Sequence, residues 1–320
     1  MQDLHLGKEI YLFFGKYKFY GIIGIFISSI LMGIIIYKVL KISKKEQIES
    51  YDQFITQFHL NQKIQNIIQT IIQIFLLISF YIMIAGFSAY FSQEWQLSNY
   101  AGTAIIVILC YIIFMGNIER LMKVNTVLVP ILMISILILI FRNADAFNLL
   151  EETTKQTSVI KAIWDAVIYT SYNSIILIPI LLPLQKCLKN KYLIFITATI
   201  CTFILIILAI SIFGLILKVD IDINKVELPT VYVAGMMEKK YKVIYGIIIL
   251  VSIYTSAISA GYGFLEKYHN NPKQYKRIVI IMSTIAFLIS NLGFTTLVNL
   301  LYPIFGILGL VQIIIILKKT

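Results

Sequence analysis

The sequence is poor in charged residues. Asp, Glu, Lys and Arg make up only 13% of the 320 residues, whereas a soluble globular domain has about 25%. Apolar residues make up 59% of the chain, and the mean hydropathy is +0.87. There is too little polar surface here to cover a water-soluble fold. The composition therefore excludes the ordinary soluble class.

Cysteine and histidine, which often serve in catalysis and metal binding, are also scarce. Cys110, Cys187 and Cys201 stand far apart, and the three histidines are scattered through polar stretches. Neither set has the spacing of metal ligands or of a redox pair. No nucleotide, metal or nucleophile motif occurs, so the sequence predicts no enzyme, no metal site and no cofactor. In so apolar a chain the net charge of +11 indicates topology, not nucleic-acid binding.

Long apolar runs are what the sequence has in quantity. Two of them occupy 19–37 and 192–217. Runs of about 18 or more apolar residues can cross ~30 Å of hydrocarbon as a helix. We therefore predict an all-α polytopic membrane protein embedded in the lipid bilayer, with a short piece at 6–15 that cannot cross alone. The nine predicted spans are 19–40, 65–91, 100–116, 125–141, 161–183, 191–217, 242–264, 277–291 and 296–317.

The loops between these spans alternate in charge. One set contains sixteen Lys and Arg residues and five acidic ones, and the other set contains six basic and seven acidic residues. Cytoplasmic loops hold the excess of Lys and Arg. The C-terminus is therefore predicted to be cytoplasmic. The basic set comprises 38–66, 117–126, 184–192, 265–277 and the tail after 317, and the other set includes 142–160 and 218–241.

A motif recurs at an offset of about 174 residues. "NIERLMKVNTVLVPI" begins at Asn117 and "NLGFTTLVNLLYPI" at Asn291, each with Val-Asn at the same spacing and Pro-Ile after it. The same offset superimposes the predicted spans, and the charge pattern puts the two motifs on opposite sides of the membrane. Inverted repeats of this kind are typical of secondary transporters, whose sites are formed by broken helices near the midplane. We predict one transmembrane domain with inverted repeats at 1–141 and 161–320.

The polar run "YTSYNS", 169–174, interrupts the span at 161–183. Polar groups are tolerated at membrane depth where they line a cavity or are buried in protein, and Asn and Ser favour local bonds to the backbone. We predict that 170–174 is the unwound middle of a discontinuous helix. The alternative is that these residues join packed helices by hydrogen bonds. The predicted substrate-binding residues are Thr170, Ser171, Tyr172, Asn173 and Ser174.

A second polar cluster lies on the span at 242–264. Its members are spaced to share one helix face, and hydroxyl oxygens are hard ligands that suit Na⁺. The alternative is that small residues allow close helix contact. The predicted ion-binding residues are Ser252, Thr255, Ser256 and Ser259.

Acidic side chains are almost absent from the spans. Glu9 lies in the short N-terminal piece, and Asp165 lies about one turn from the outer end of its span. An acid inside a membrane is a functional candidate, although Asp165 is close enough to the surface for a solvated role. The stretches 41–64 and 226–241 suit short amphipathic helices at the interface.

Four stretches resemble a known family. They are "LGKEIYLFFGKYKFYGIIGI" (6–25), "YIMIAGFSAYF" (81–91), "LMKVNTVLVPIL" (121–132) and "AVIYTSYNSIILIPIL" (166–181). They are similar to the YkvI-type bacterial membrane proteins, of the amino acid–polyamine–organocation superfamily with its LeuT-like 5+5 fold. The resemblance covers nearly the whole chain. It implies an integral protein of the bacterial cell membrane, related to amino-acid permeases and, more distantly, to spore germinant receptors.

The chain departs from this family at its start. The family's first helix ends in a glycine-rich turn resembling G-F-A-S-G-Q-E-I, of which only Gly7-Lys8-Glu9-Ile10 is visible here. The resemblance thus implies an N-terminally truncated first repeat and about nine full transmembrane helices. The expected function is secondary transport of a small solute such as an amino acid, coupled to Na⁺ or H⁺. The alternatives are a germinant-receptor-like nutrient sensor, an inactive truncated paralogue, or a start codon further upstream. The oligomeric state stays open.

Overall fold

The computed structural model describes residues 7–48, 51–58, 61–115, 119–142, 158–217, 226–236, 239–268, 271–289 and 292–318. Every regular element in these ranges is helical. The long helices are α2 (Phe19–Glu46), α4 (Gln62–Trp95), α5 (Asn99–Met115), α6 (Glu119–Phe141), α7 (Val159–Leu184), α8 (Lys191–Leu217), α10 (Lys239–Leu265), α11 (Pro272–Ile289) and α12 (Phe294–Lys318). The short ones are α1 (Lys8–Phe13), η2 (Gly15–Tyr17), α3 (Tyr51–Thr56), α9 (Pro229–Gly235) and η5 (Glu266–Tyr268).

Within the described ranges, five helices are long and apolar enough to cross a membrane. They are Phe19–Glu46, Gln62–Trp95, Lys191–Leu217, Lys242–Tyr268 and Phe294–Lys318. Two shorter apolar helices, Asn99–Met115 and Pro130–Phe141, coincide with the predicted spans at 100–116 and 125–141. The predicted spans at 161–183 and 277–291 fall on α7 and α11. The chain is an all-α polytopic membrane protein, as predicted.

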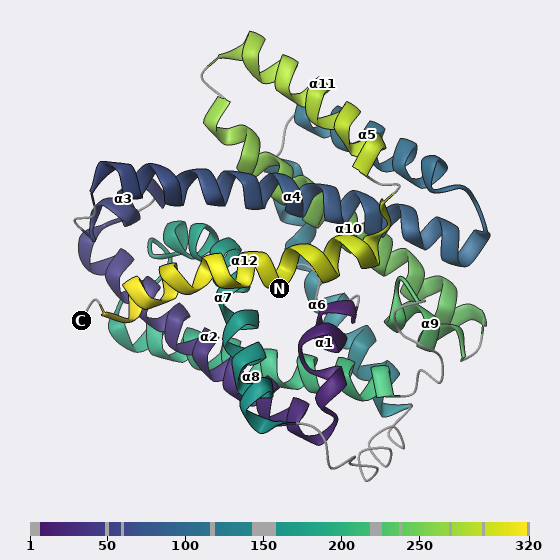
Figure 1. Ribbon diagram of the computed structural model, residues 1–320, viewed down its shortest axis with the longest axis horizontal. Helices are drawn as coiled ribbons and strands as arrows, with labels where there is room; N and C mark the ends of the chain where they lie inside the picture. Colours follow the sequence, from purple (N-terminus) through teal and green to yellow (C-terminus); the bar gives the residue numbers. More distant parts are fainter. Residues whose placement is uncertain are drawn as a thin grey trace.

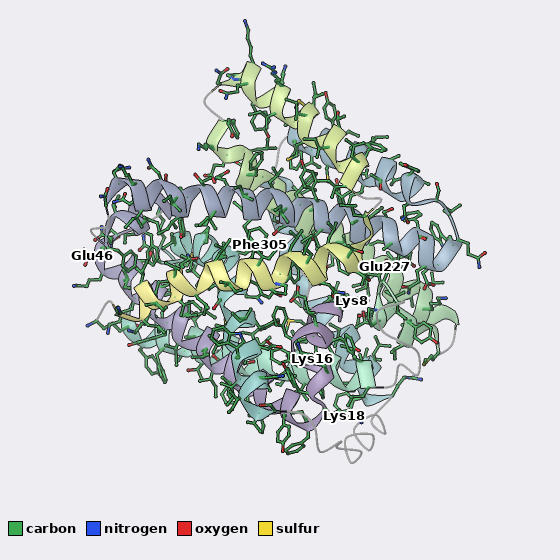
Figure 2. All side chains as sticks on the ribbon, viewed as in Figure 1. Lys8, Lys16, Lys18, Glu46, Glu227 and Phe305 are labelled. Atoms are coloured by element: carbon green, nitrogen blue, oxygen red, sulfur yellow. The ribbon has the colours of Figure 1, made fainter. Side chains whose placement is uncertain are left out.

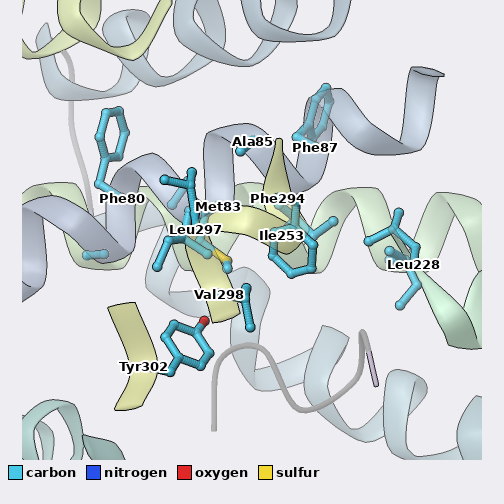
Figure 3. Close-up of a cluster of buried hydrophobic side chains, with 14 of the residues drawn as sticks. Phe80, Met83, Ala85, Phe87, Leu228, Ile253, Phe294, Leu297, Val298 and Tyr302 are labelled. Atoms are coloured by element: carbon cyan, nitrogen blue, oxygen red, sulfur yellow. The ribbon is translucent and has the colours of Figure 1, made fainter. Parts of the chain in front are cut away.

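The helices pack in a small number of extensive pairs. α7 lies along both α2 and α12, α4 lies along α10, and α2 lies along α8. In Figure 1, α4 and α12 cross the middle of the molecule, α5 and α11 lie together above them, and α2 and α8 lie below. Figure 3 shows one part of the core, where Met83 of α4 approaches Ile253 and Leu297 of α10 and α12. Apolar side chains such as Ile30 and Phe203 are exposed on the outer faces, as expected where lipid is the solvent.

Polar side chains fix several helix ends. The side chain of Asn61 accepts a hydrogen bond from the backbone N–H of Lys63 and caps the start of α4. Glu227, which precedes α9, accepts bonds of 2.8 Å from both the backbone N–H and the hydroxyl of Thr295 at the start of α12. A carboxylate at a helix N-terminus satisfies free N–H groups and complements the helix dipole. Glu227 therefore ties the segment before α9 to α12.

The N-terminal piece folds inward as the short helix α1. It begins after Gly7, whose φ of +82° is a left-handed conformation that glycine adopts without strain. A Cβ atom at Gly7 would also lie 3.0 Å from the side chain of Thr230 in α9. α1 contacts α7, α8 and α12, and η2 leads from it into α2. The predicted short helices within 41–64 and 226–241 are present as α3 and α9.

The predicted break in α7 is wrong. α7 is a continuous helix from Val159 to Leu184 and includes the whole of 170–174. Four polar side chains of this run donate to carbonyls about one turn back in their own helix, so the helix needs no unwinding to satisfy them. The bonds are Thr170 Oγ1 to Ala166 O (2.8 Å), Ser171 Oγ to Val167 O (2.7 Å), Asn173 Nδ2 to Tyr169 O (3.0 Å) and Ser174 Oγ to Ser171 O (2.7 Å).

Candidate functional site

The polar run of α7 is buried along its whole length. The hydroxyl of Thr170 lies 3.3 Å from the carbonyl oxygen of Ser28 in α2 and bonds to it. On another face, a Cβ at Gly309 of α12 would lie only 2.4 Å from the carbonyl oxygen of Ser171. α7 and α12 thus approach each other closely at this glycine. The contacts of Thr170 and Ser171 therefore fit the alternative interpretation, in which polar residues of this run join packed helices.

Tyr172 differs from its neighbours because it reaches another element. Its hydroxyl donates a hydrogen bond to the Oε2 atom of Glu9 in α1, and Glu9 is only 1% exposed. The Tyr172 ring is stacked with Phe13, with ring centroids 5.6 Å apart, and with Tyr302 of α12, with centroids 4.7 Å apart. A carboxylate from α1, a hydroxyl from α7 and a ring from α12 therefore meet inside the protein.

The hydroxyl of Tyr302 is a further polar group at this place. Tyr302 is 1% exposed, and its hydroxyl oxygen has no hydrogen-bond partner among the described residues. Buried polar atoms nearly always have partners. Figure 3 shows the hydroxyl directed toward the side of Leu297 and Val298. A buried hydroxyl without a partner among the described residues thus lies next to the Tyr172 ring.

Lys8 places a second ionisable group in α1. It is 1% exposed, and its Nζ donates to the carbonyl oxygen of Val226 at 2.6 Å. Figure 2 shows Lys8 near the middle of the molecule and Lys16 and Lys18 nearer its edge. Burying an ammonium and a carboxylate is expensive unless each is hydrogen-bonded or paired. Lys8 and Glu9 are adjacent in α1, and both are buried and hydrogen-bonded.

Asp165 forms a separate contact nearer the surface. Its Oδ2 accepts a hydrogen bond from the Tyr17 hydroxyl at 2.8 Å and lies 2.7 Å from Lys16 Nζ. Burial, followed by the hydrogen bond to Asp165, raises the pKa of Tyr17 above its ordinary value, so Tyr17 stays a donor at neutral pH. Asp165 thus fastens η2 to α7.

The hydroxyl cluster of α10 is not brought together into one cage. Thr255 and Ser256 are buried, Ser252 is half-buried and Ser259 is exposed. The hydroxyls of Ser259 and Thr255 donate to carbonyls of their own helix, at 2.8 and 3.0 Å. α10 packs mainly on α4 and α6, whereas α7 packs on α2 and α12. The exposure of Ser259 does not fit a dehydrated cation site.

Sequence reasoning singled out Glu9 and Tyr172 separately and missed Tyr302. The available signal for Tyr302 was its place directly before Pro303 in the repeated motif. The repeat residues Asn117 and Asn291 and most of the loop at 142–160 lie outside the described residues, as do the side chains of 119–129.

Two curated proteins of Bacillus subtilis (strain 168) are similar to the chain along nearly its whole length. The uncharacterized membrane protein YkvI is 28% identical over 311 residues, which cover 95% of this chain and 88% of YkvI. The uncharacterized protein YyaD is 22% identical over 317 residues, which cover 97% of this chain and 90% of YyaD. No family model matches the chain. The similarity therefore concerns the whole chain and not one motif.

Proposed function

The chain belongs to the YkvI-type membrane proteins, and on this basis we propose that it is a secondary transporter of a small solute such as an amino acid. The observation that carries the proposal is the buried Glu9 carboxylate, bonded to Tyr172 within the polar run of α7. Ionisable groups inside membrane proteins are costly and mark the paths of substrates and ions. The Tyr302 hydroxyl gives a solute a donor at the same place.

We further propose the LeuT-like inverted repeat, with α2 to α6 related to α8 to α12. α2 and α8 begin at 19 and 191, α5 and α11 at 99 and 272, and α6 and α12 at 119 and 294, so the offsets are 172, 173 and 175 residues. Contacts recur between the mates: α4 meets α12 as α10 meets α6, and α2 meets α12 as α8 meets α6. α2, α4 and α5 also contact their own mates, α8, α10 and α11. A twofold axis between the halves accounts for this pattern, which supports the repeat.

For the coupling ion we propose H⁺ over Na⁺. A buried carboxylate can take up a proton, and its neutral form costs far less to hold away from water than its charged form. Loss of the charge also weakens the bond from Tyr172, because hydrogen bonds to ionised groups are the stronger ones. The Tyr172 hydroxyl would then be freer to bind solute. The α10 hydroxyls are a weaker alternative because Ser259 is exposed.

Within the predicted substrate-binding run, we propose Tyr172 and Asn173 as the solute contacts. Thr170 and Ser171 face close helix neighbours. Ser174 donates its single hydroxyl proton to Ser171 O, whereas the Asn173 side chain has two N–H donors and an acceptor oxygen. Asn173→Leu is expected to abolish solute binding while the protein still folds, since its amide bonds within α7. A residue that only joins helices would instead lower stability by an average of about 0.6 kcal/mol and leave binding intact.

Proteoliposomes test the proposal. Protein reconstituted with an acidic exterior is expected to accumulate labelled amino acids until a protonophore collapses the gradient. Glu9→Gln should abolish accumulation while solute exchange across the membrane continues. Asp165→Asn is the matched control, because it neutralises an acid that only fastens η2 to α7, and it should still accumulate solute. Accumulation that needs Na⁺ and ignores the pH gradient would refute H⁺ coupling, and binding without exchange would identify a sensor.

A further inference from the structure

A groove lies between α2 and α8 on the outer surface of the helices. Its volume is about 680 Å³, and it is lined by α2 from Phe26 to Lys38 and by α8 from Phe195 to Ile206. Side chains along its walls face outward: Ile30 is 50% exposed and Phe203 is 62% exposed. α2 and α8 lie below the central α4–α12 pair in Figure 1. The groove therefore opens outward, toward the lipid, and its lining does not include Glu9 or Tyr172.

The floor of the groove suits a hydrocarbon chain. α2 and α8 approach closely at Gly33, where a Cβ would lie 2.0 Å from the hydroxyl oxygen of Thr202. The two threonine hydroxyls that line the groove already donate within α8, from Thr202 to Ala198 O at 2.8 Å and from Thr199 to Phe195 O at 2.9 Å. The remaining surface is almost entirely apolar, so no ordered polar ligand is needed to satisfy it.

The length of the groove matches one leaflet of a bilayer. Lys38 follows Phe26 by twelve positions in one helix, which at about 1.5 Å per residue is roughly 18 Å. Half of a hydrocarbon core about 30 Å thick is roughly 15 Å. A single acyl chain can therefore lie along the groove with its headgroup at one end.

Among the described residues that line the groove, the one positive charge, that of Lys38, lies at one end. Lys38 lines the groove and donates to the carbonyl oxygen of Leu317 at 2.7 Å, which holds its ammonium at this place. Lys41 follows one turn later, with its Nζ 5.7 Å from the centre of the Tyr37 ring. Tyr37 in turn meets Phe195 across the groove, with ring centroids 6.3 Å apart. Lys41 is exposed, and two neighbouring ammonium groups attract phosphate oxygens electrostatically.

We propose that this groove is a binding site for one anionic phospholipid. One of its two acyl chains lies between α2 and α8, and the phosphate lies at Lys38 and Lys41. Apolar surface, leaflet-matched length and paired ammonium groups at one end fit this ligand together. Basic pockets beside membrane helices select anionic headgroups on the same electrostatic grounds. This site is independent of the proposed transport.

Native mass spectrometry with added phosphatidylglycerol or phosphatidylcholine of equal chain length tests the site. The protein should retain one phosphatidylglycerol and little phosphatidylcholine. Lys38→Gln, which keeps a donor for the Leu317 carbonyl, should lower phosphatidylglycerol retention about fivefold. Lys45→Gln is the control on the same helix, since this side chain is 78% exposed and does not line the groove, and it should have no effect.

A second pair of variants tests the groove itself. Thr199→Trp fills it and should reduce retention of both lipids. Ile200→Trp adds the same side chain at the next residue, which is 53% exposed and lies outside the groove lining, and it should retain lipid like the parent. Equal retention of the two lipids by the parent, or unchanged retention by Thr199→Trp, would overturn the proposal. So would a dimer that cross-links through Thr199→Cys, because the occupant would then be a second copy.

Discussion

The hydrogen bond between Tyr172 and Glu9 offers the sharpest test of the candidate site. Tyr172→Phe removes one oxygen atom and leaves the ring in place. The stacking on Phe13 and Tyr302, at centroid distances of 5.6 and 4.7 Å, is retained. The change therefore isolates the donor to a carboxylate that is 1% exposed.

The expected magnitude depends on the charge of Glu9. A hydrogen bond to an ionised group contributes about 1.5–3 kcal/mol, and a neutral pair about 0.5–1.5 kcal/mol. Hydrogen bonds between membrane helices average only about 0.6 kcal/mol. We expect Tyr172→Phe to lower the free energy of unfolding by at least about 1.5 kcal/mol at neutral pH. A loss near the membrane average would mean that Glu9 is already protonated.

The assay is a double-mutant cycle by denaturant titration in mixed micelles. Glu9→Gln and Tyr172→Phe are measured singly and together. If their effects add to within about 0.5 kcal/mol, the two groups are not coupled, and the site described here is refuted. Tyr302→Phe is the control, because its hydroxyl is buried and has no partner among the described residues. Its removal should cost nothing or stabilise the protein, since an unpaired buried polar group is itself unfavourable.

Two further outcomes follow from orientation and packing. Ser98 lies in the turn between the predicted spans at 65–91 and 100–116, which the alternation of the basic loops puts outside. In intact cells an impermeant maleimide should label Ser98→Cys and leave the exposed native Cys187 unlabelled; labelling of Cys187 would reverse the predicted topology. Gly309→Ala should destabilise the protein by about 1–3 kcal/mol through overpacking, because its Cβ would lie 2.4 Å from the Ser171 carbonyl oxygen. Gly263→Ala is the control, since the nearest atom there is a flexible side-chain end at 3.3 Å, and equal effects of the two changes would contradict the close approach of α7 and α12.

The sequence predicts the class and the helix positions well for a physical reason. Only a helix satisfies its own backbone in hydrocarbon, so a long apolar run has essentially one structure available. All nine predicted spans fall on helices of the described chain, although five are long and apolar enough to cross by themselves. The short helices α3 and α9 lie within the two predicted stretches, although most of α9 is buried.

Whether α7 is broken could not be judged from the sequence, because Ser, Thr and Asn are compatible with both an unwound segment and a continuous helix. Their side chains can replace helical hydrogen bonds in an unwound segment or add a second bond to a carbonyl one turn back. The structure has the second arrangement, and Asn173 and Thr170 are examples of it. The choice depends on neighbouring helices, such as the approach of α12 at Gly309, which no local pattern encodes.

The partners within the site were unpredictable for a related reason. Glu9 and Tyr172 are 163 residues apart, and nothing near either residue indicates the other. Tyr302 stacks on Tyr172 because α12 turns that face toward α7. Gly306 and Gly309 allow that close contact, with Ile168 and Ser171 opposite them. An intramembrane acid can be recognised in a sequence, but the group that it faces is set by helix rotation and distance.

Burial of Lys8 and Glu9 in α1 adds little to the stability of the fold, which supports the proposed functional role of Glu9. Apolar side chains of similar volume generally stabilise a protein as well as a buried charged pair does, or better, yet α1 places Lys8 and Glu9 side by side in the interior. The two groups hold different elements: Lys8 bonds to the segment before α9, and Glu9 bonds to α7. Protonation of Glu9 would weaken its hydrogen bond with Tyr172 and leave the bond from Lys8 to Val226 O in place. On the proposed function, α1 would then keep its contact on the α9 side while loosening from α7. Glu9→Gln removes this proton-dependent step, so accumulation should be lost while exchange continues.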